Sequence, residues 1–92
     1  MRVATLFAGI VRMQVGERHK VLEVEEGSTA ADLLDRLGEE CGPRLPRSLW
    51  DPEAGRFHKS IRLARRGGPV LDPADTLSDG DEILFIFPMA GG

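Results

Sequence analysis

Short apolar stretches and one helical repeat divide the chain into predicted elements. Residues 2–8 (RVATLFA) are apolar and β-branched, and residues 18–25 (RHKVLEVE) alternate between apolar and polar side chains, so both are predicted strands. Gly16 interrupts the chain between them, and we expect the two strands to pair as a hairpin. Three later segments also have extended character: residues 58–65, residues 70–71 and residues 82–87.

A helical pattern follows the second strand. Thr29 and Asp32 have the spacing of a capping box, with Ser28 as a competing cap. Gly42-Pro43 ends the pattern, and Gly38 weakens the last turns by up to ~1 kcal/mol. Apolar side chains recur at the helical period along one side: Ala30, Leu33, Leu34, Leu37 and Cys41.

Residues 43–57 contain three Pro and one Gly, which predicts an ordered but irregular loop. We expect Ile61 and Leu63 to point inward from the strand that follows. The order strand, strand, helix, strand, short strand, strand fits two layers. The predicted fold is therefore α+β, one mixed sheet with a single main helix packed across it, in one domain of residues 1–92. Apolar side chains of the loop are expected to return to the core: Leu45, Leu49, Trp50 or Phe57.

The composition is that of an ordinary globular chain, with 41% hydrophobic and 29% charged residues. No apolar stretch approaches the ~20 residues of a membrane span, and residues 3–11 lack the flank of a cleaved leader. Cys41 is the one cysteine, which excludes an internal disulfide and predicts a reducing, cytoplasmic setting. A net charge of −3 does not indicate a nucleic-acid partner.

Charge is nevertheless unevenly distributed along the chain. Residues 44–66 carry seven Lys or Arg, whereas residues 67–92 carry five acidic residues and no Lys or Arg. Either both segments are solvated surface, or they orient protein partners. The basic segment lacks aromatic residues interleaved with its arginines, which argues against RNA binding.

Side chains capable of chemistry form no recognisable site. His19 and His58 have no partner at motif spacing, and Cys41 at the end of an apolar helix face is expected to be a buried apolar residue. The acidic residues between 72 and 82 lack the ligand spacing of a calcium loop. Gly67-Gly68 precedes neither a helix nor a Lys-Ser or Lys-Thr pair, as a phosphate loop requires. The sequence therefore predicts no catalytic residue and no metal site.

The last residues have an unusual pattern. Pro88, Met89 and Ala90 lead to Gly91 and Gly92 directly after a predicted strand, and we expect a flexible tail there. Backbone without Cβ can pass through a narrow channel. A carboxylate becomes reactive once an enzyme joins it to AMP, after which sulfur or an amine can attack the acyl carbon. Ordering the tail costs about 1–2 kcal/mol per residue, so a neighbouring surface must supply binding energy.

The last predicted strand provides such a surface. Residues 83–87 are apolar at every position, whereas a helix covers only one face of the sheet. We assign Ile83 and Phe85 to the core, and Leu84 and Ile86 to a partner-binding patch that Phe87 can join. The alternative is that the loop at residues 43–57 covers Leu84 and Ile86.

These motifs resemble those of a known family. They are Phe7-Ala8-Gly9, the helix starting at Thr29 with Leu33-Leu34 and Leu37, Leu77-Ser78-Asp79-Gly80-Asp81-Glu82-Ile83, and Pro88 through Gly92. Nearly the whole chain resembles the ubiquitin-like β-grasp sulfur carriers, the group of the molybdopterin synthase small subunit and the thiamine-pathway sulfur carrier.

The resemblance implies a co-substrate rather than an enzyme. An E1-like adenylyltransferase that uses ATP and Mg activates Gly92, and a persulfide-bearing sulfurtransferase converts the adenylate to a thiocarboxylate. The sulfur then passes to an acceptor enzyme such as a large synthase subunit. Gly91, Ala90, Met89 and Pro88 are implied to thread into the activating enzyme. Leu84, Ile86 and Phe87 match positions that dock partners, and no cofactor is bound permanently.

Three functions remain as hypotheses. The first is a sulfur carrier for cofactor biosynthesis, with molybdopterin as the first pathway to consider. The second is a ubiquitin-like modifier joined to lysines through Gly92, because the tail chemistry is shared until the nucleophile differs. The third is a non-catalytic binding module whose terminal glycines are incidental.

Overall fold

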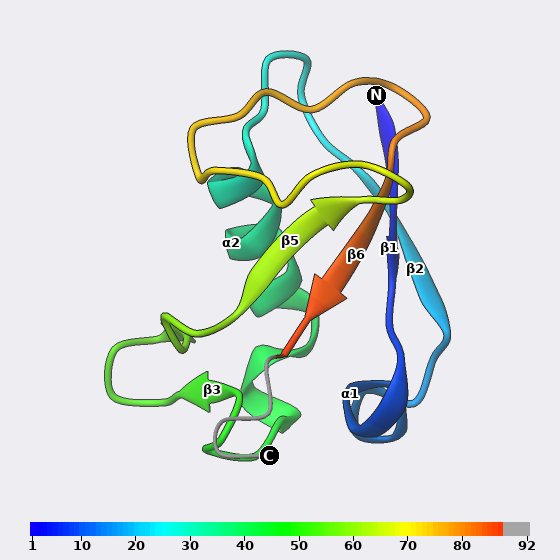
Figure 1. The fold of residues 1–92 in the computed structure, drawn as a ribbon. Coiled ribbons are helices and arrows are strands. Elements are labelled where there is room, and N and C mark those ends of the chain that lie inside the picture. Colours follow the sequence, from blue (N-terminus) through cyan, green and yellow to red (C-terminus); the bar gives the residue numbers. More distant parts are fainter. Residues whose placement is uncertain (88–92) are drawn as a thin grey trace.

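Four strands form one mixed sheet, and one long helix crosses a single face of it (Figure 1). β1 pairs antiparallel with β2 and parallel with β6, and β5 pairs antiparallel with β6. The order across the sheet is β2-β1-β6-β5. This arrangement confirms the predicted α+β fold. The main elements are β1 (Arg2–Leu6), β2 (His19–Glu23), α2 (Ala30–Cys41), β5 (Arg62–Arg65) and β6 (Glu82–Ile86).

This computed structural model describes residues 1–87, so the predicted tail at residues 88–92 lies outside the described residues. Shorter elements complete the chain: α1 (Gly9–Val15), a 3-10 turn η1 (Gly42–Arg44), β3 (Trp50–Asp51) and β4 (Arg56–Phe57). No helix among residues 1–87 has the length and apolar character needed to cross a bilayer.

The core lies between α2 and one face of the sheet. Thr29 caps α2 through the predicted capping box, with the Asp32 amide 3.3 Å from Thr29 Oγ1 and the Thr29 amide 2.9 Å from Asp32 Oδ2. Aromatic rings join the sheet to the segment after the helix, since Phe85 lies 5.7 Å from Phe7 and 5.2 Å from Phe57 between ring centroids. The largest fully buried apolar side chains are Leu33, Leu37, Leu49, Ile83 and Val3.

The predicted pairing of the first two strands is confirmed, but the predicted direct hairpin connection between them is wrong. Val3 pairs with Leu22 across β1 and β2, but α1 fills the connection. Val11 and Val15, one helical turn apart, bury all but 2% and 7% of their surface. Gly16 ends α1 in a left-handed conformation with φ 87°. The spacing of four between Val11 and Val15 places both on one face of a helix, which the hairpin prediction overlooked.

The segment at residues 43–57 is more regular than the predicted loop. It contains η1 and the two-stranded β3–β4 ribbon, and its expected return to the core is confirmed by buried Leu45, Leu49 and Phe57. The next strand begins only at Arg62, since residues 58–61 form a turn. The predicted extended piece at residues 70–71 is an isolated bridge between Val70 and Ala64.

The Trp50 ring explains why α2 contains a glycine near its end. A Cβ on Gly38 would lie 2.7 Å from Trp50 Cζ3, and one on Gly42 would lie 2.5 Å from the same ring. Trp50 also meets Phe57 edge to face, with centroids 5.2 Å apart. The β3–β4 ribbon therefore packs through Trp50 over Gly38 of α2 and Gly42 of η1, where a Cβ would force the ring to shift.

Gly38→Ala is expected to destabilise the wild-type protein by about 1–3 kcal/mol, because the new methyl group must displace the Trp50 ring. In a Trp50→Ala background the same change is expected to stabilise α2 by up to about 1 kcal/mol, since alanine favours helix. Urea unfolding followed by circular dichroism tests this double-mutant cycle. A Gly38→Ala effect of the same sign in both backgrounds would contradict the packing.

The turn before β6 fixes where that strand starts. Gly80 adopts φ 83°, and its amide donates to the Arg2 carbonyl at 2.8 Å, while the Arg2 amide donates to Asp79 Oδ1 at 2.7 Å. Asp81 accepts from Arg65 Nε at 3.2 Å and from the Ser78 amide at 2.8 Å. Burial by itself raises the pKa of Asp81, but the hydrogen bonds from Arg65 and Ser78 outweigh it, so the pKa lies below its usual value.

Asp81→Asn is expected to cost about 1–3 kcal/mol at neutral pH, because it removes charge-assisted hydrogen bonds. Since folding lowers the pKa of Asp81, this stabilisation is present above the ordinary aspartate pKa of about 3.9 and is lost as the pH falls through the folded value. Urea unfolding of both proteins from pH 7 to acid should therefore show the difference shrinking. Exposed Asp35→Asn is the control and should show little effect at any pH.

Candidate functional site

The apolar strand β6 divides its side chains between the two faces of the sheet. Ile83 and Phe85 are 0% and 6% exposed and face the core, as predicted. Leu84 and Ile86 are half-buried and belong to the other face. The predicted partner-binding pair thus lies on the sheet face opposite α2 (Figure 1).

Neighbouring strands extend this apolar surface. The parallel register places Leu6 of β1 beside Leu84, and the antiparallel register places Ala64 of β5 on its other side. A hollow of about 520 Å³ lies where β1 and β6 end. It is lined by outer-face residues of the strands, by core side chains and by part of α1: Leu6, Leu84, Ile86, Phe87, Phe7, Phe85, Ala8, Gly9 and Val11. We call this the sheet hollow.

The segment at residues 43–57 does not cover the sheet hollow. Its residues are not among those lining it, and Trp50 and Phe57 pack instead towards α2 and Phe85. The alternative in which this loop covers Leu84 and Ile86 is therefore wrong. The segment packs on the helix side instead, because Gly38 and Gly42 have no Cβ and let the Trp50 ring approach closely there.

Phe87 is the last described residue and lies at the rim of the sheet hollow. It is half-buried, packs against the core cluster and also lines the hollow. The predicted modified residue Gly92 and the predicted threading residues Gly91, Ala90, Met89 and Pro88 lie outside the described residues. The chain therefore leaves the described part of the fold beside the apolar surface predicted to bind partners.

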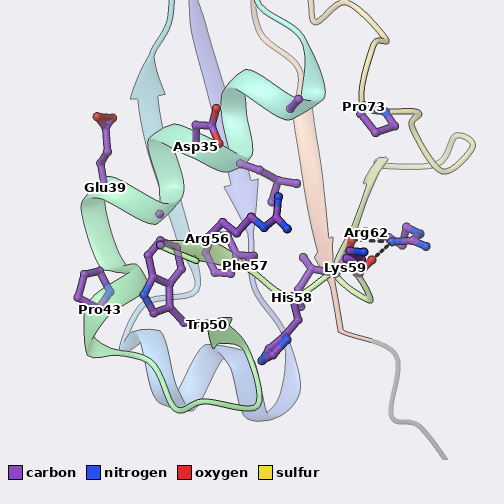
Figure 2. A pocket seen from close by; sticks show the side chains of 15 residues that line it. Asp35, Glu39, Pro43, Trp50, Arg56, Phe57, His58, Lys59, Arg62 and Pro73 are labelled. Atoms are coloured by element: carbon purple, nitrogen blue, oxygen red, sulfur yellow. Dashed lines mark hydrogen bonds between the residues drawn. The ribbon is translucent and has the colours of Figure 1, made fainter. Parts of the chain in front are cut away.

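A second hollow lies on the helix side of the molecule, between α2 and the turn after β4 (Figure 2). Its volume is about 640 Å³, and Trp50 and Phe57 contribute to its apolar lining. Asp35 and Glu39 extend from α2, while Arg56 and Lys59 come from the opposite side (Figure 2).

The cysteine and the two histidines considered as reactive groups lie in surroundings that suit structural or surface residues. Cys41 is 2% exposed, its thiol donates to the Leu37 carbonyl at 3.2 Å, and burial raises its pKa, which suits a buried apolar residue. His58 donates from Nε2 to the Arg47 carbonyl, and His19 is exposed on β2. Within residues 1–87, no three His, Cys, Asp or Glu side chains are grouped to hold a metal ion.

Two ion pairs connect the basic segment at residues 44–66 with the acidic segment at residues 67–92. Arg65 Nη2 lies 3.1 Å from Asp81 Oδ2, and Arg66 Nη1 lies 3.3 Å from Glu82 Oε1. These pairs link β5 to the start of β6 within the chain. Arg56, Lys59 and Arg62 are exposed near the turn before β5.

Sequence reasoning missed two parts of the sheet hollow. Leu6 was assigned to a strand without a role, because its contact with Leu84 depends on a parallel register between distant segments. The contribution of α1 was missed together with the helix itself, although the spacing of Val11 and Val15 and the glycines at both ends were available signals.

The sheet order, the parallel pairing of β1 with β6 and the single crossing helix define a ubiquitin-like β-grasp protein. The chain belongs to the ThiS family, whose family model matches residues 5–92. This confirms the resemblance to the β-grasp sulfur carriers.

Solved structures share the whole fold. SAMP1 from Haloferax volcanii is 24% identical with a TM-score of 0.79, and 100% of each chain is covered. Another H. volcanii structure, of small archaeal modifier protein 1, is 20% identical with a TM-score of 0.77 and covers 96% of this chain and 98% of that one. Molybdopterin converting factor subunit 1 from Pyrococcus furiosus, as that structure is described, is 19% identical with a TM-score of 0.62, covering 97% and 99%. No match was found among curated protein sequences.

Leu84→Ala is expected to cost less than about 1.5 kcal/mol, because Leu84 lines a hollow open to solvent, whereas Ile83→Ala should cost about 2–5 kcal/mol. Urea unfolding followed by circular dichroism measures both. Equal costs for the two neighbours would contradict the assignment of Leu84 to the outer face.

Proposed function

We propose that this protein is a sulfur carrier whose Gly92 carboxylate is adenylated by an E1-like enzyme using ATP and Mg. A sulfur donor such as a persulfide-bearing sulfurtransferase then converts the adenylate to a thiocarboxylate. The thiocarboxylate passes its sulfur to an acceptor enzyme in cofactor biosynthesis in the cytoplasm, with molybdopterin as the first pathway to test. The protein acts as a co-substrate and itself supplies no catalytic group.

The observation that supports this proposal most is the sheet hollow at the point where the chain leaves β6. Leu84 and Ile86 offer half-buried apolar surface, and Phe87 connects that surface to the residues that precede Gly92. A partner docked on this hollow gains binding energy from apolar burial, at about 25 cal/mol per Å². That energy can offset the entropy cost of ordering residues 88–92 in the partner.

The chemistry divides between the two proteins. Within this chain, Leu6, Leu84 and Ile86 orient the carrier, and the glycines at 91 and 92 let the backbone enter a narrow site. On the partner, the Gly92 carboxylate oxygen attacks the α-phosphorus of ATP and pyrophosphate leaves, so the acyl carbon now carries AMP as a good leaving group. The terminal sulfur of the donor's persulfide then attacks the acyl carbon, the bond to AMP breaks, and AMP leaves. A second thiol of the donor cleaves the S–S bond of the resulting acyl disulfide, which releases the thiocarboxylate and leaves the donor as a disulfide.

A second function, modification of lysines on other proteins through Gly92, has one observation in its favour. The H. volcanii structure named small archaeal modifier protein 1 shares the fold at a TM-score of 0.77 over 96% of this chain. The two functions share adenylation and differ in the nucleophile. Intact-mass analysis of protein from native cells separates them, since exchange of one oxygen for sulfur indicates a carrier and conjugate ladders indicate a modifier.

Deletion of Gly91 and Gly92 is expected to abolish ATP–pyrophosphate exchange catalysed by the cognate E1-like enzyme. Leu84→Arg should lower kcat/KM of this exchange by about tenfold or more, because it places a charge in an apolar interface. Val70→Ser is the control, since Val70 is 56% exposed and does not line the sheet hollow. Unchanged exchange after the deletion would support the binding-module hypothesis instead.

A further inference from the structure

The sheet has one covered edge and one open edge. Along β5, Val70 forms a bridge with Ala64 and the Leu71 amide donates to the Leu63 carbonyl at 2.7 Å, so the chain after β5 covers that edge. β2 lies at the opposite edge (Figure 1), and within residues 1–87 no strand or bridge pairs along its outer side. An open edge with unpaired backbone groups is a template for a further strand.

The pairing of β2 with β1 shows which backbone groups point outward. Just beyond β2, the Met1 amino group donates to the Val24 carbonyl at 2.7 Å and the Val24 amide donates to the Met1 carbonyl at 2.9 Å. Bonded pairs alternate along an antiparallel ladder, so every second residue of β2 directs its amide and carbonyl away from β1. These outward residues are His19, Val21 and Glu23. The Arg36 guanidinium, which donates to the Glu23 carbonyl at 2.8 Å, agrees with this assignment.

The same three residues expose their side chains on the sheet face opposite α2. His19 and Glu23 are exposed, and Val21 between them is 51% exposed although it is apolar. Glu23 Oε1 accepts from Arg2 Nε at 3.0 Å, which leaves Oε2 able to accept another donor. The strand thus carries a donor, an apolar side chain and an acceptor at alternate positions.

This order of residues is complementary to itself. In an antiparallel pair of two β2 strands centred on Val21, each Val21 lies opposite the other and each His19 lies opposite Glu23 of the second copy. The imidazole N–H of His19 can then donate to the Glu23 carboxylate on both sides of an apolar contact. A second copy of this chain therefore fits both the backbone and the side chains of the open edge.

We propose that β2 is a self-association edge, at which two copies of the chain pair antiparallel about Val21 and join their sheets into one. The Val21 amide of each copy donates to the Val21 carbonyl of the other, and His19 and Glu23 exchange backbone bonds in the same way. Because β1 lies between β2 and β6, this pairing leaves Leu84 and Ile86 open to a partner. The inference is thus independent of the proposed function.

The small size of this edge sets the strength of the association. β2 has five residues, His19–Glu23, and strand pairing through them buries less surface than the ~800 Å² per partner of a stable complex. Association is therefore expected to be weak and to need a high protein concentration.

Sedimentation velocity of the full chain from about 10 µM to about 1 mM tests the association, and we expect a dimer whose fraction grows with concentration. Val21→Lys should lose the dimer, because it places two ammonium groups opposite each other at the centre of the pair. Val70→Lys is the matched control: Val70 is 56% exposed at the covered edge, and this variant should retain the dimer. Circular dichroism checks that both variants are folded.

Amide hydrogen exchange followed by NMR tests the register. The Val21 amide points away from β1, so it should exchange quickly in dilute protein and more slowly at high concentration. The Leu22 amide is directed to β1 and serves as the internal control, since its protection should change little with concentration.

A charge exchange tests the facing pair. His19→Glu should weaken the dimer because it places two carboxylates opposite each other, and adding Glu23→His should restore it.

Four results would each overturn the β2 pairing. They are a chain that stays monomeric up to about 1 mM, a dimer that persists in Val21→Lys, a Val21 amide whose exchange does not slow with concentration, and a charge exchange that fails to restore the dimer. A dimer lost in Leu84→Arg but intact in Val21→Lys would assign self-association to the sheet hollow instead.

Discussion

The parallel pairing of β1 with β6 is the constraint on which the rest of the structure depends. It is fixed by the turn at residues 78–81, where the amides of Arg2 and Gly80 bond across the two segments and the Ala4 amide donates to the Asp81 carbonyl at 2.9 Å. Because parallel strands finish at the same edge, the end of β6 meets the end of β1 and the start of α1 (Figure 1). One pairing thus brings the sheet hollow and the exit of the chain together.

Local patterns were sufficient to predict a large part of this fold. The helix α2, its Thr29 cap and the alternation of Ile83 and Phe85 all depend on residues close in sequence. The β3–β4 ribbon could not be predicted in this way, because its order comes from Trp50 packing on helix positions that lack a side chain. The helix α1 was missed because the hairpin prediction treats the residues between the strand at residues 2–8 and Gly16 as its connection and gives them no element of their own.

In the candidate site, too, some residues could be predicted from local sequence patterns and others could not. Leu84 and Ile86 were predictable, since a strand apolar at every position must leave one set of side chains outside the core. Leu6 was not, because a parallel register is set by contacts between distant segments. The charge pattern also had a partly internal explanation, since Arg65 and Arg66 pair with acidic residues at the start of β6. The tail lies outside the described residues, so its role remains a prediction.

Trp50 also gives the protein a built-in optical probe. The chain has one tryptophan and no tyrosine, so its near-ultraviolet emission comes almost entirely from this indole. The ring sits over Gly38 and Gly42 on the helix side, and it does not line the sheet hollow. Fluorescence should therefore report whether the ribbon remains docked on α2, with little interference from a ligand bound at Leu84.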